Sequence, residues 1–98
     1  MKTVTELLLE IRKRPGIYIG TTSLIRLRCY IHGYIYAVKH EAGLDCGERV
    51  FWDFNEWLNK KYNIKDSICW ENGLTNISAN DAFDLFYKEF DIYLETLK

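Results

Sequence analysis

The sequence predicts an all-α fold, a compact bundle of four to five helices in a single domain that covers residues 1–98. Apolar residues recur three and four positions apart along most of the chain, which is the spacing of one helix face. Hydrophobic residues make up 48% of a chain with one proline and six glycines, and this composition argues against disorder and against a turn-rich β-fold. A length of 98 residues is typical of one domain, so we expect no second core.

The first predicted helix runs from about residue 4 to residue 13, and its apolar face consists of Val4, Leu7, Leu8 and Ile11. Pro15 and Gly16 end it, because the residue before a proline is pushed out of the α region. Residues 17–20 are expected to be extended. An α+β fold with a minimal strand in this stretch is the alternative to the all-α fold.

The second predicted helix is the longest, from about residue 23 to residue 40, with Thr22 or Ser23 as its N-cap. One apolar face consists of Leu24, Leu27, Ile31, Ile35 and Val38. Another is lined by Tyr30, Gly33 and Ala37, where the glycine would let a neighbour approach closely. Because both faces are apolar, we expect this helix to be central, and residues 43–47 to form a loop after it.

A third helix is predicted over about residues 50–62, with an apolar face of Phe51, Phe54, Trp57 and Leu58. Residues 63–66 are predicted to form a turn. Residues 67–76 are either a short helix or an irregular packed segment, and Gly73 argues against the helix.

The last predicted helix follows Ser78-Ala79-Asn80-Asp81, which has the spacing of a capping box. Its expected buried face consists of Ala82, Phe83, Phe86, Phe90, Tyr93, Leu94 and Leu97. The opposite face is mostly acidic and consists of Asp84, Lys88, Asp91 and Glu95.

The formal net charge of −1 hides a segregation of charge along the chain. Residues 1–39 hold seven basic and two acidic groups, whereas residues 40–98 hold six basic and twelve acidic groups. Either the two parts pair with each other in the fold, or an acidic face stays exposed and attracts a basic partner.

Residues with the chemistry of catalysis or metal binding do not form a recognised set. Three cysteines without a CxxC motif predict reduced thiols and a cytoplasmic protein, and no stretch is long and apolar enough for a membrane span. The histidines, cysteines and carboxylates lack metal-ligand spacing, so we expect no metal and no cofactor. Cys29 and His32 lie three positions apart, but Cys29 is expected to be a small core residue. We therefore expect no enzymatic activity.

A basic segment offers a different function, that of a small regulatory protein that binds nucleic acid. Tyr18 and Tyr30 lie near a group of five cations, Arg12, Lys13, Arg14, Arg26 and Arg28. Such a group would contact phosphates, with bases stacked on the tyrosines. The net charge and the acidic remainder of the chain weigh against this alternative.

The order of several motifs resembles that of small bacterial immunity proteins of polymorphic-toxin and contact-dependent growth-inhibition systems. The resemblance covers nearly the whole chain. It rests on Arg14-Pro15-Gly16-Ile17-Tyr18-Ile19-Gly20, on Ser23-Leu24 with Leu27, Tyr30-Ile31 and Gly33-Tyr34, on Phe54, Trp57, Lys61-Tyr62 and Trp70, and on Ala82-Phe83 with Phe86-Tyr87. It implies an intracellular protein without enzymatic activity that binds and neutralises a cognate toxin domain, often a nuclease.

An inhibitor of a basic nuclease would present acidic groups with aromatic anchors among them. We expect the toxin to contact one face that combines Asp84, Asp91 and Glu95 of the last helix with Asp53 and Glu56 of the third, and we expect Trp52 and Tyr87 to be its aromatic anchors. The sequence leaves open whether exposed aromatic residues serve this partner or a homo-oligomer.

Overall fold

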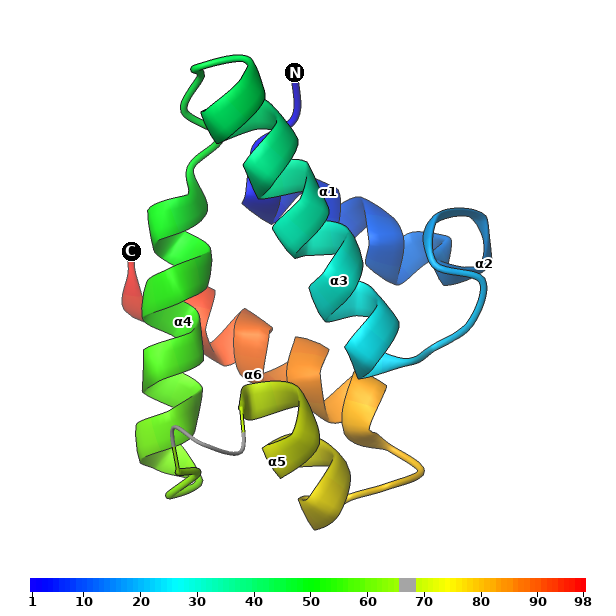
Figure 1. Ribbon diagram of the computed structural model, residues 1–98. Coiled ribbons are helices and arrows are strands. Elements are labelled where there is room, and N and C mark those ends of the chain that lie inside the picture. The colour runs from blue at the N-terminus through cyan, green and yellow to red at the C-terminus, as the bar shows by residue number, and fades with distance from the viewer. Residues whose placement is uncertain (66–68) are drawn as a thin grey trace. The chain divides into compact units, whose positions relative to one another are not determined.

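The computed structural model describes residues 1–65 and 69–98, and these residues contain six α-helices, one π-helical turn and no strand. The all-α fold is confirmed, with one helix more than the four to five expected. The elements in chain order are α1 (Val4–Lys13), α2 (Pro15–Tyr18), α3 (Leu24–Ile35), the π-helical turn (Tyr36–Glu41), α4 (Glu48–Lys61), α5 (Trp70–Ile77) and α6 (Ala82–Thr96) (Figure 1). The chain divides into two compact units, Met1–Trp52 and Asp53–Lys98, and α4 runs from the first into the second.

The start of α1 is held by a capping box that the apolar pattern alone does not indicate. The amide of Glu6 donates to the hydroxyl of Thr3, and the amide of Thr3 donates to the carboxylate of Glu6. The predicted apolar face is confirmed in full, because the buried residues of this helix are Val4, Leu7, Leu8 and Ile11.

The expectation of an extended stretch at residues 17–20, and with it the minimal strand, is wrong. Pro15 begins the short helix α2, and the amide of Ile19 donates to the carbonyl of Pro15. Proline suits the first helical position because its φ is already helical and that position needs no amide proton. Gly20 then leaves the helical region with a φ of 80°.

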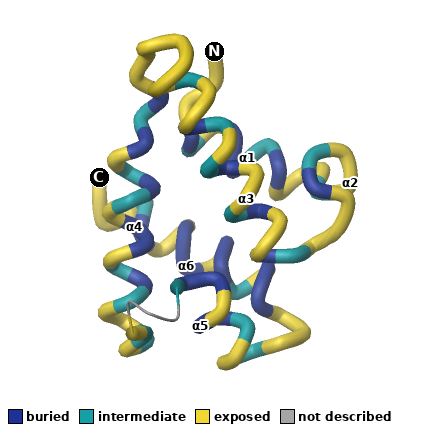
Figure 2. Tube along the Cα trace, viewed as in Figure 1, coloured by how far each residue is buried: buried dark blue, intermediate teal, exposed yellow. Residues whose placement is uncertain are grey.

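Helix α3 begins where it was predicted, with Ser23 as its N-cap, and buries Leu24, Leu27, Ile31 and Ile35. Its second apolar face is not covered, because Tyr30 and Gly33 are exposed, as is Ala37 in the π-helical turn that follows. Figure 2 shows exposed residues along α3. The expectation that both apolar faces are buried is therefore wrong. Cys29 is exposed on the same helix, so the expectation that it is a core residue is wrong too.

The loop between the π-helical turn and α4 lies where residues 43–47 predicted it. Gly43 and Gly47 adopt φ values of 67° and 71°, which side chains with a Cβ rarely tolerate. Glu48 opens α4 next to the loop, and its carboxylate lies 3.1 Å from the Nζ of Lys39. The amide of Glu48 itself and the Lys39 ammonium hold the pKa of this carboxyl at about 2, so it is ionised at neutral pH.

Helix α5 resolves the choice that the sequence left open for the described part of residues 67–76, because Trp70–Ile77 is helical. Gly73 has a packing role there. A Cβ built at this position would lie 2.7–2.8 Å from three side-chain atoms of Ile64, which is too close for any real side chain. The predicted turn at Asp66 and the residues Ser67 and Ile68 lie outside the described residues.

Helix α6 begins three residues later than the capping-box spacing predicted. Asp81 rather than Ser78 is the N-cap, no side chain caps the helix, and the Asp81 amide donates to the Ser78 carbonyl in a turn. The buried face was predicted well, except that Leu94 is only half-buried and Leu97 is 54% exposed. Tyr87 and Glu89 are buried in addition to the expected residues.

We expect Gly73→Ala to lower the free energy of unfolding by about 1–2 kcal/mol, because the strain against Ile64 outweighs the better helix propensity of alanine. Gly33→Ala is the matched control. Nothing lies within 4 Å of a Cβ at that position, so the same change should raise the stability by about 0.5–1 kcal/mol. Urea unfolding in dilute solution measures both. Equal effects of the two variants would contradict the close approach of Ile64 to Gly73.

Candidate partner-binding surface

The outer side of α6 is the acidic surface that the sequence pattern predicted. Asp84, Asp91 and Glu95 are all exposed, together with Lys88 of the same stripe. Ile92 lies beside them and is 40% exposed, so an apolar group is available among the charges. Glu95 also pairs with Lys98 at 3.0 Å, an exposed contact that contributes little to stability.

Aromatic contacts in the second unit decide which side of α6 is its outer side. The ring of Phe54 on α4 lies 5.4 Å from Phe86, 4.9 Å from Phe90 and 5.3 Å from Tyr93, measured between ring centroids. Each acidic residue of the stripe stands two positions from Phe86 or Tyr93. Two positions turn a helix by about 200°, so these carboxylates lie nearly opposite α4.

The acidic residues of α4 belong to a different surface. Asp53 and Glu56 are exposed. Burial raises the pKa of the Tyr93 hydroxyl, and the negative charge of Asp53 raises it further, which places Asp53 near the side of α6 that faces α4. The expected single face of five carboxylates is therefore wrong, because α6 itself separates its outer stripe from the acidic residues of α4.

The two aromatic residues expected as anchors are not both available. Tyr87 is 2% exposed, and its ring centroid lies 5.1 Å from those of Phe83 and Phe86. It is a core residue, which removes it from the candidate surface. Trp52 is half-buried in the first unit, where its ring lies edge-on to His32 at 5.1 Å.

A buried carboxylate that sequence reasoning did not single out fixes α6 against the end of α4. Glu89 is buried, its Oε2 lies 2.5 Å from the Nζ of Lys61, and its Oε1 accepts a hydrogen bond from the Tyr62 hydroxyl at 2.9 Å. Burial and the hydrogen bond to Glu89 raise the pKa of Tyr62. The sequence pattern could have indicated that Glu89 is buried, because it lies three positions after Phe86 on the buried face of α6.

The basic segment forms a second candidate surface in the first unit. Arg12, Lys13 and Arg14 are exposed at the end of α1, which packs against α2 and α3. The guanidinium of Arg26 donates to the carbonyl of Ile19 at 3.2 Å. The ring of Tyr18 lies edge-on to that of Tyr30 at 6.0 Å, so α2 and α3 bring basic and aromatic residues together.

Thiol, metal and membrane chemistry give no further site in the described part of the chain. Burial and the neighbouring carboxylate of Glu48 raise the pKa of the Cys46 thiol, which keeps it protonated. Within residues 1–65 and 69–98, no three His, Cys, Asp or Glu side chains come together as a metal site. In the same residues no helix has the length and apolar character that a membrane span requires.

Comparisons of the chain with protein families, with curated proteins and with solved structures found no match.

We expect Glu89→Ala to lower the free energy of unfolding by about 1–3 kcal/mol, because it leaves the Tyr62 hydroxyl without its acceptor and Lys61 without its counter-charge. Glu95→Ala removes an exposed ion pair and should change stability by about 0.5 kcal/mol or less. Thermal and urea unfolding measure the difference. A Glu89 variant as stable as the Glu95 variant would show that the buried carboxylate does not fix α6.

Proposed function

We propose that this chain is an immunity protein that binds the nuclease domain of a cognate bacterial toxin and covers its basic, phosphate-binding surface. The acidic outer stripe of α6 is the observation that carries the proposal. The whole-chain resemblance to immunity proteins of contact-dependent growth-inhibition systems supports it independently.

The distribution of charge between the two units fits this role. Residues 53–98 hold five lysines and nine acidic residues, a formal charge of −4, and no arginine. A nuclease carries Lys and Arg where it binds the phosphate backbone of its substrate. An acidic surface competes with the nucleic acid for these Lys and Arg side chains and raises the rate of association with the toxin. Proteins with acidic surfaces are repelled by it.

The arrangement on α6 also suits a lasting complex. Charges at the rim of an interface mainly set the association rate, and apolar or aromatic groups within it set the dissociation rate. Ile92 supplies an exposed apolar group next to Asp91 and Glu95. Glu89 and the ring of Phe54 hold α6 in place. The acidic stripe on α6 is therefore ordered before a partner binds.

Co-expression with the product of the adjacent gene is the first test. We expect a stable 1:1 complex on size-exclusion chromatography and survival of cells that otherwise die from the toxin. If no toxin gene lies beside this one and nothing co-purifies, the proposal is wrong.

Two matched double variants then locate the interface. Asp84→Asn with Glu95→Gln removes two negative charges from the outer stripe of α6, and Asp53→Asn with Glu56→Gln removes two from α4. We leave Asp91 in place so that each variant removes two charges. The α6 variant should bind the toxin about tenfold more slowly at low salt, with a smaller effect at high salt, because screening removes steering.

The α4 variant should bind at nearly the wild-type rate, since its carboxylates lie on another surface. Surface plasmon resonance over a range of salt concentrations measures both rates, and thermal unfolding checks that each variant is folded. If only the α4 variant binds the toxin more slowly, the interface lies on α4 and not on α6.

A second candidate function rests on the contact between α2 and α3 in the first unit. Tyr18, Tyr30 and the anchored guanidinium of Arg26 would bind a single strand through stacking and phosphate contacts. Gel shifts with RNA and single-stranded DNA at low salt test it. Arg14→Ala with Arg26→Ala should then abolish the shift, whereas Lys60→Ala with Lys65→Ala, which removes two cations of the second unit, should preserve it. No shift by the wild-type chain at low salt would dismiss this function.

A further inference from the structure

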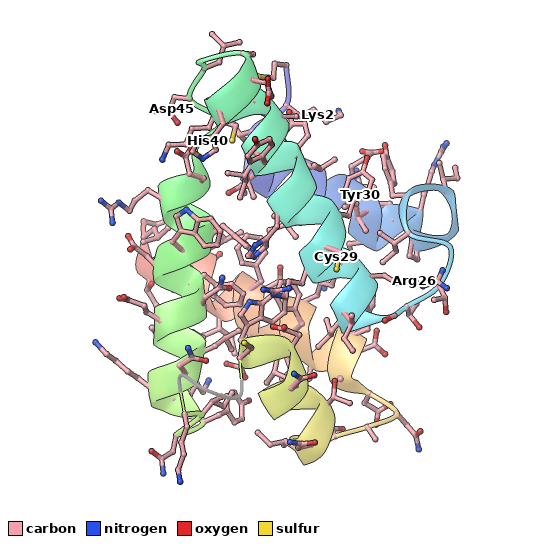
Figure 3. The ribbon with its side chains drawn as sticks, in the orientation of Figure 1. Lys2, Arg26, Cys29, Tyr30, His40 and Asp45 are labelled. Atoms are coloured by element: carbon pink, nitrogen blue, oxygen red, sulfur yellow. The ribbon has the colours of Figure 1, made fainter. Side chains whose placement is uncertain are left out.

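The outward face of α3 carries several exposed apolar and aromatic residues. Ile25 is 55% exposed and Tyr36 is 57% exposed, and Cys29, Tyr30 and Gly33 are exposed between them. In Figure 3, Arg26 and Tyr30 extend towards α2, where the ring of Tyr30 lies edge-on to that of Tyr18, and Cys29 lies on the outward side of the helix. Apolar and tyrosine-rich patches of this kind mark protein interfaces more often than plain surface.

Gly33 lies at the middle of this face. The exposed residues are placed almost symmetrically about it: Tyr30 and Tyr36 are three positions before and after, and Cys29 and Ala37 are four positions before and after. Nothing lies within 4 Å of a Cβ at Gly33, so the backbone itself is open to a neighbour. A helix without a side chain at its crossing point can approach another helix closely.

The charges at the two ends of the face are opposite. Arg26 lies seven positions before Gly33, and its guanidinium is anchored by a hydrogen bond to the carbonyl of Ile19. Glu41 is exposed eight positions after Gly33, at the end of the π-helical turn. Both therefore lie about 10–12 Å from Gly33 along the helix axis. In an antiparallel copy of the same helix, His40 stands at the position opposite Arg26, and Glu41 is one residue further along, within reach of the long Arg26 side chain at each end.

We propose that a second copy of this chain covers the outward face of α3, in a two-fold symmetric dimer whose α3 helices cross antiparallel at Gly33. A self-complementary face of this kind is what a two-fold interface requires, because a residue i of one copy meets residue j of the other and j in turn meets i. Tyr30 of one copy packs against Tyr36 of the other, and Arg26 of one copy pairs with Glu41 of the other. This inference is independent of the proposed toxin-binding function and uses none of its residues.

Sedimentation equilibrium over a wide range of protein concentration tests the dimer. The wild-type chain should pass from the mass of one chain to twice that mass as the concentration rises. Gly33→Arg should remain monomeric, because it places a large charged side chain at the crossing point. Gly16→Arg is the matched control, since it makes the same substitution at another exposed helical glycine with open space around it, and it should dimerise like the wild type.

A charge-reversal cycle tests the orientation of the pair without changing the crossing point. Arg26→Glu and Glu41→Arg should each weaken dimerisation about tenfold, and the double variant should regain most of the loss, because the two charges still oppose each other. A parallel arrangement would give no such recovery and would overturn the proposed geometry.

Cross-linking gives a third readout. In a Cys29→Ser background, Gly33→Cys should form an intermolecular disulfide under mild oxidation, because the two Cα atoms at the crossing lie within the span of a disulfide, about 4.4–6.8 Å. Gly16→Cys in the same background should not. A wild-type chain that stays monomeric at about 1 mM overturns the proposal. The proposal is also wrong if the wild-type chain is monomeric and Gly33→Arg abolishes toxin binding, because the outward face of α3 then binds the toxin.

Discussion

The rings that surround Phe54 set the rotation of α6 about its own axis in the second unit. Phe86, Phe90 and Tyr93 lie three or four positions apart, so they can all meet one ring only if a single side of α6 faces α4. Turning the helix to expose these rings would break their contacts with Phe54. The carboxylates two positions away are therefore held at the outer side, and the candidate binding surface is a consequence of how the core packs.

Glu89 adds a directional constraint that aromatic packing lacks. Rings tolerate small slides past one another, but a carboxylate that accepts from both Lys61 and Tyr62 fixes the height of α6 along α4. Gly73 makes a comparable contribution on α5, where the missing side chain lets Ile64 approach the helix. The second unit thus combines an apolar cluster with two contacts of defined geometry, as a chain with a small core requires.

The first unit differs from the second in its formal charge and in the exposed face of α3. Residues 1–52 hold eight Lys and Arg against five acidic residues, so their formal charge of +3 contrasts with the −4 of residues 53–98. Helix α3 buries one apolar face and leaves the other exposed around Gly33. The two proposed interfaces therefore use separate residues. A toxin would contact the acidic stripe of α6, and a second copy of the chain would contact the apolar and tyrosine-bearing face of α3.

The sequence by itself determined most of the inner face of each long helix, because burial repeats with the helical period and that period is local. The stripe of α1 and most of that of α6 could be predicted for this reason. The start of α6 could not, since Ser78 has the right spacing for a cap but the backbone turns there and Asp81 takes the position. Only the tertiary structure decided how many faces of a helix are covered. It exposed the second apolar face of α3, buried Tyr87, and divided the acidic residues between two surfaces, because each of these outcomes depends on which neighbour packs against a helix and from which side.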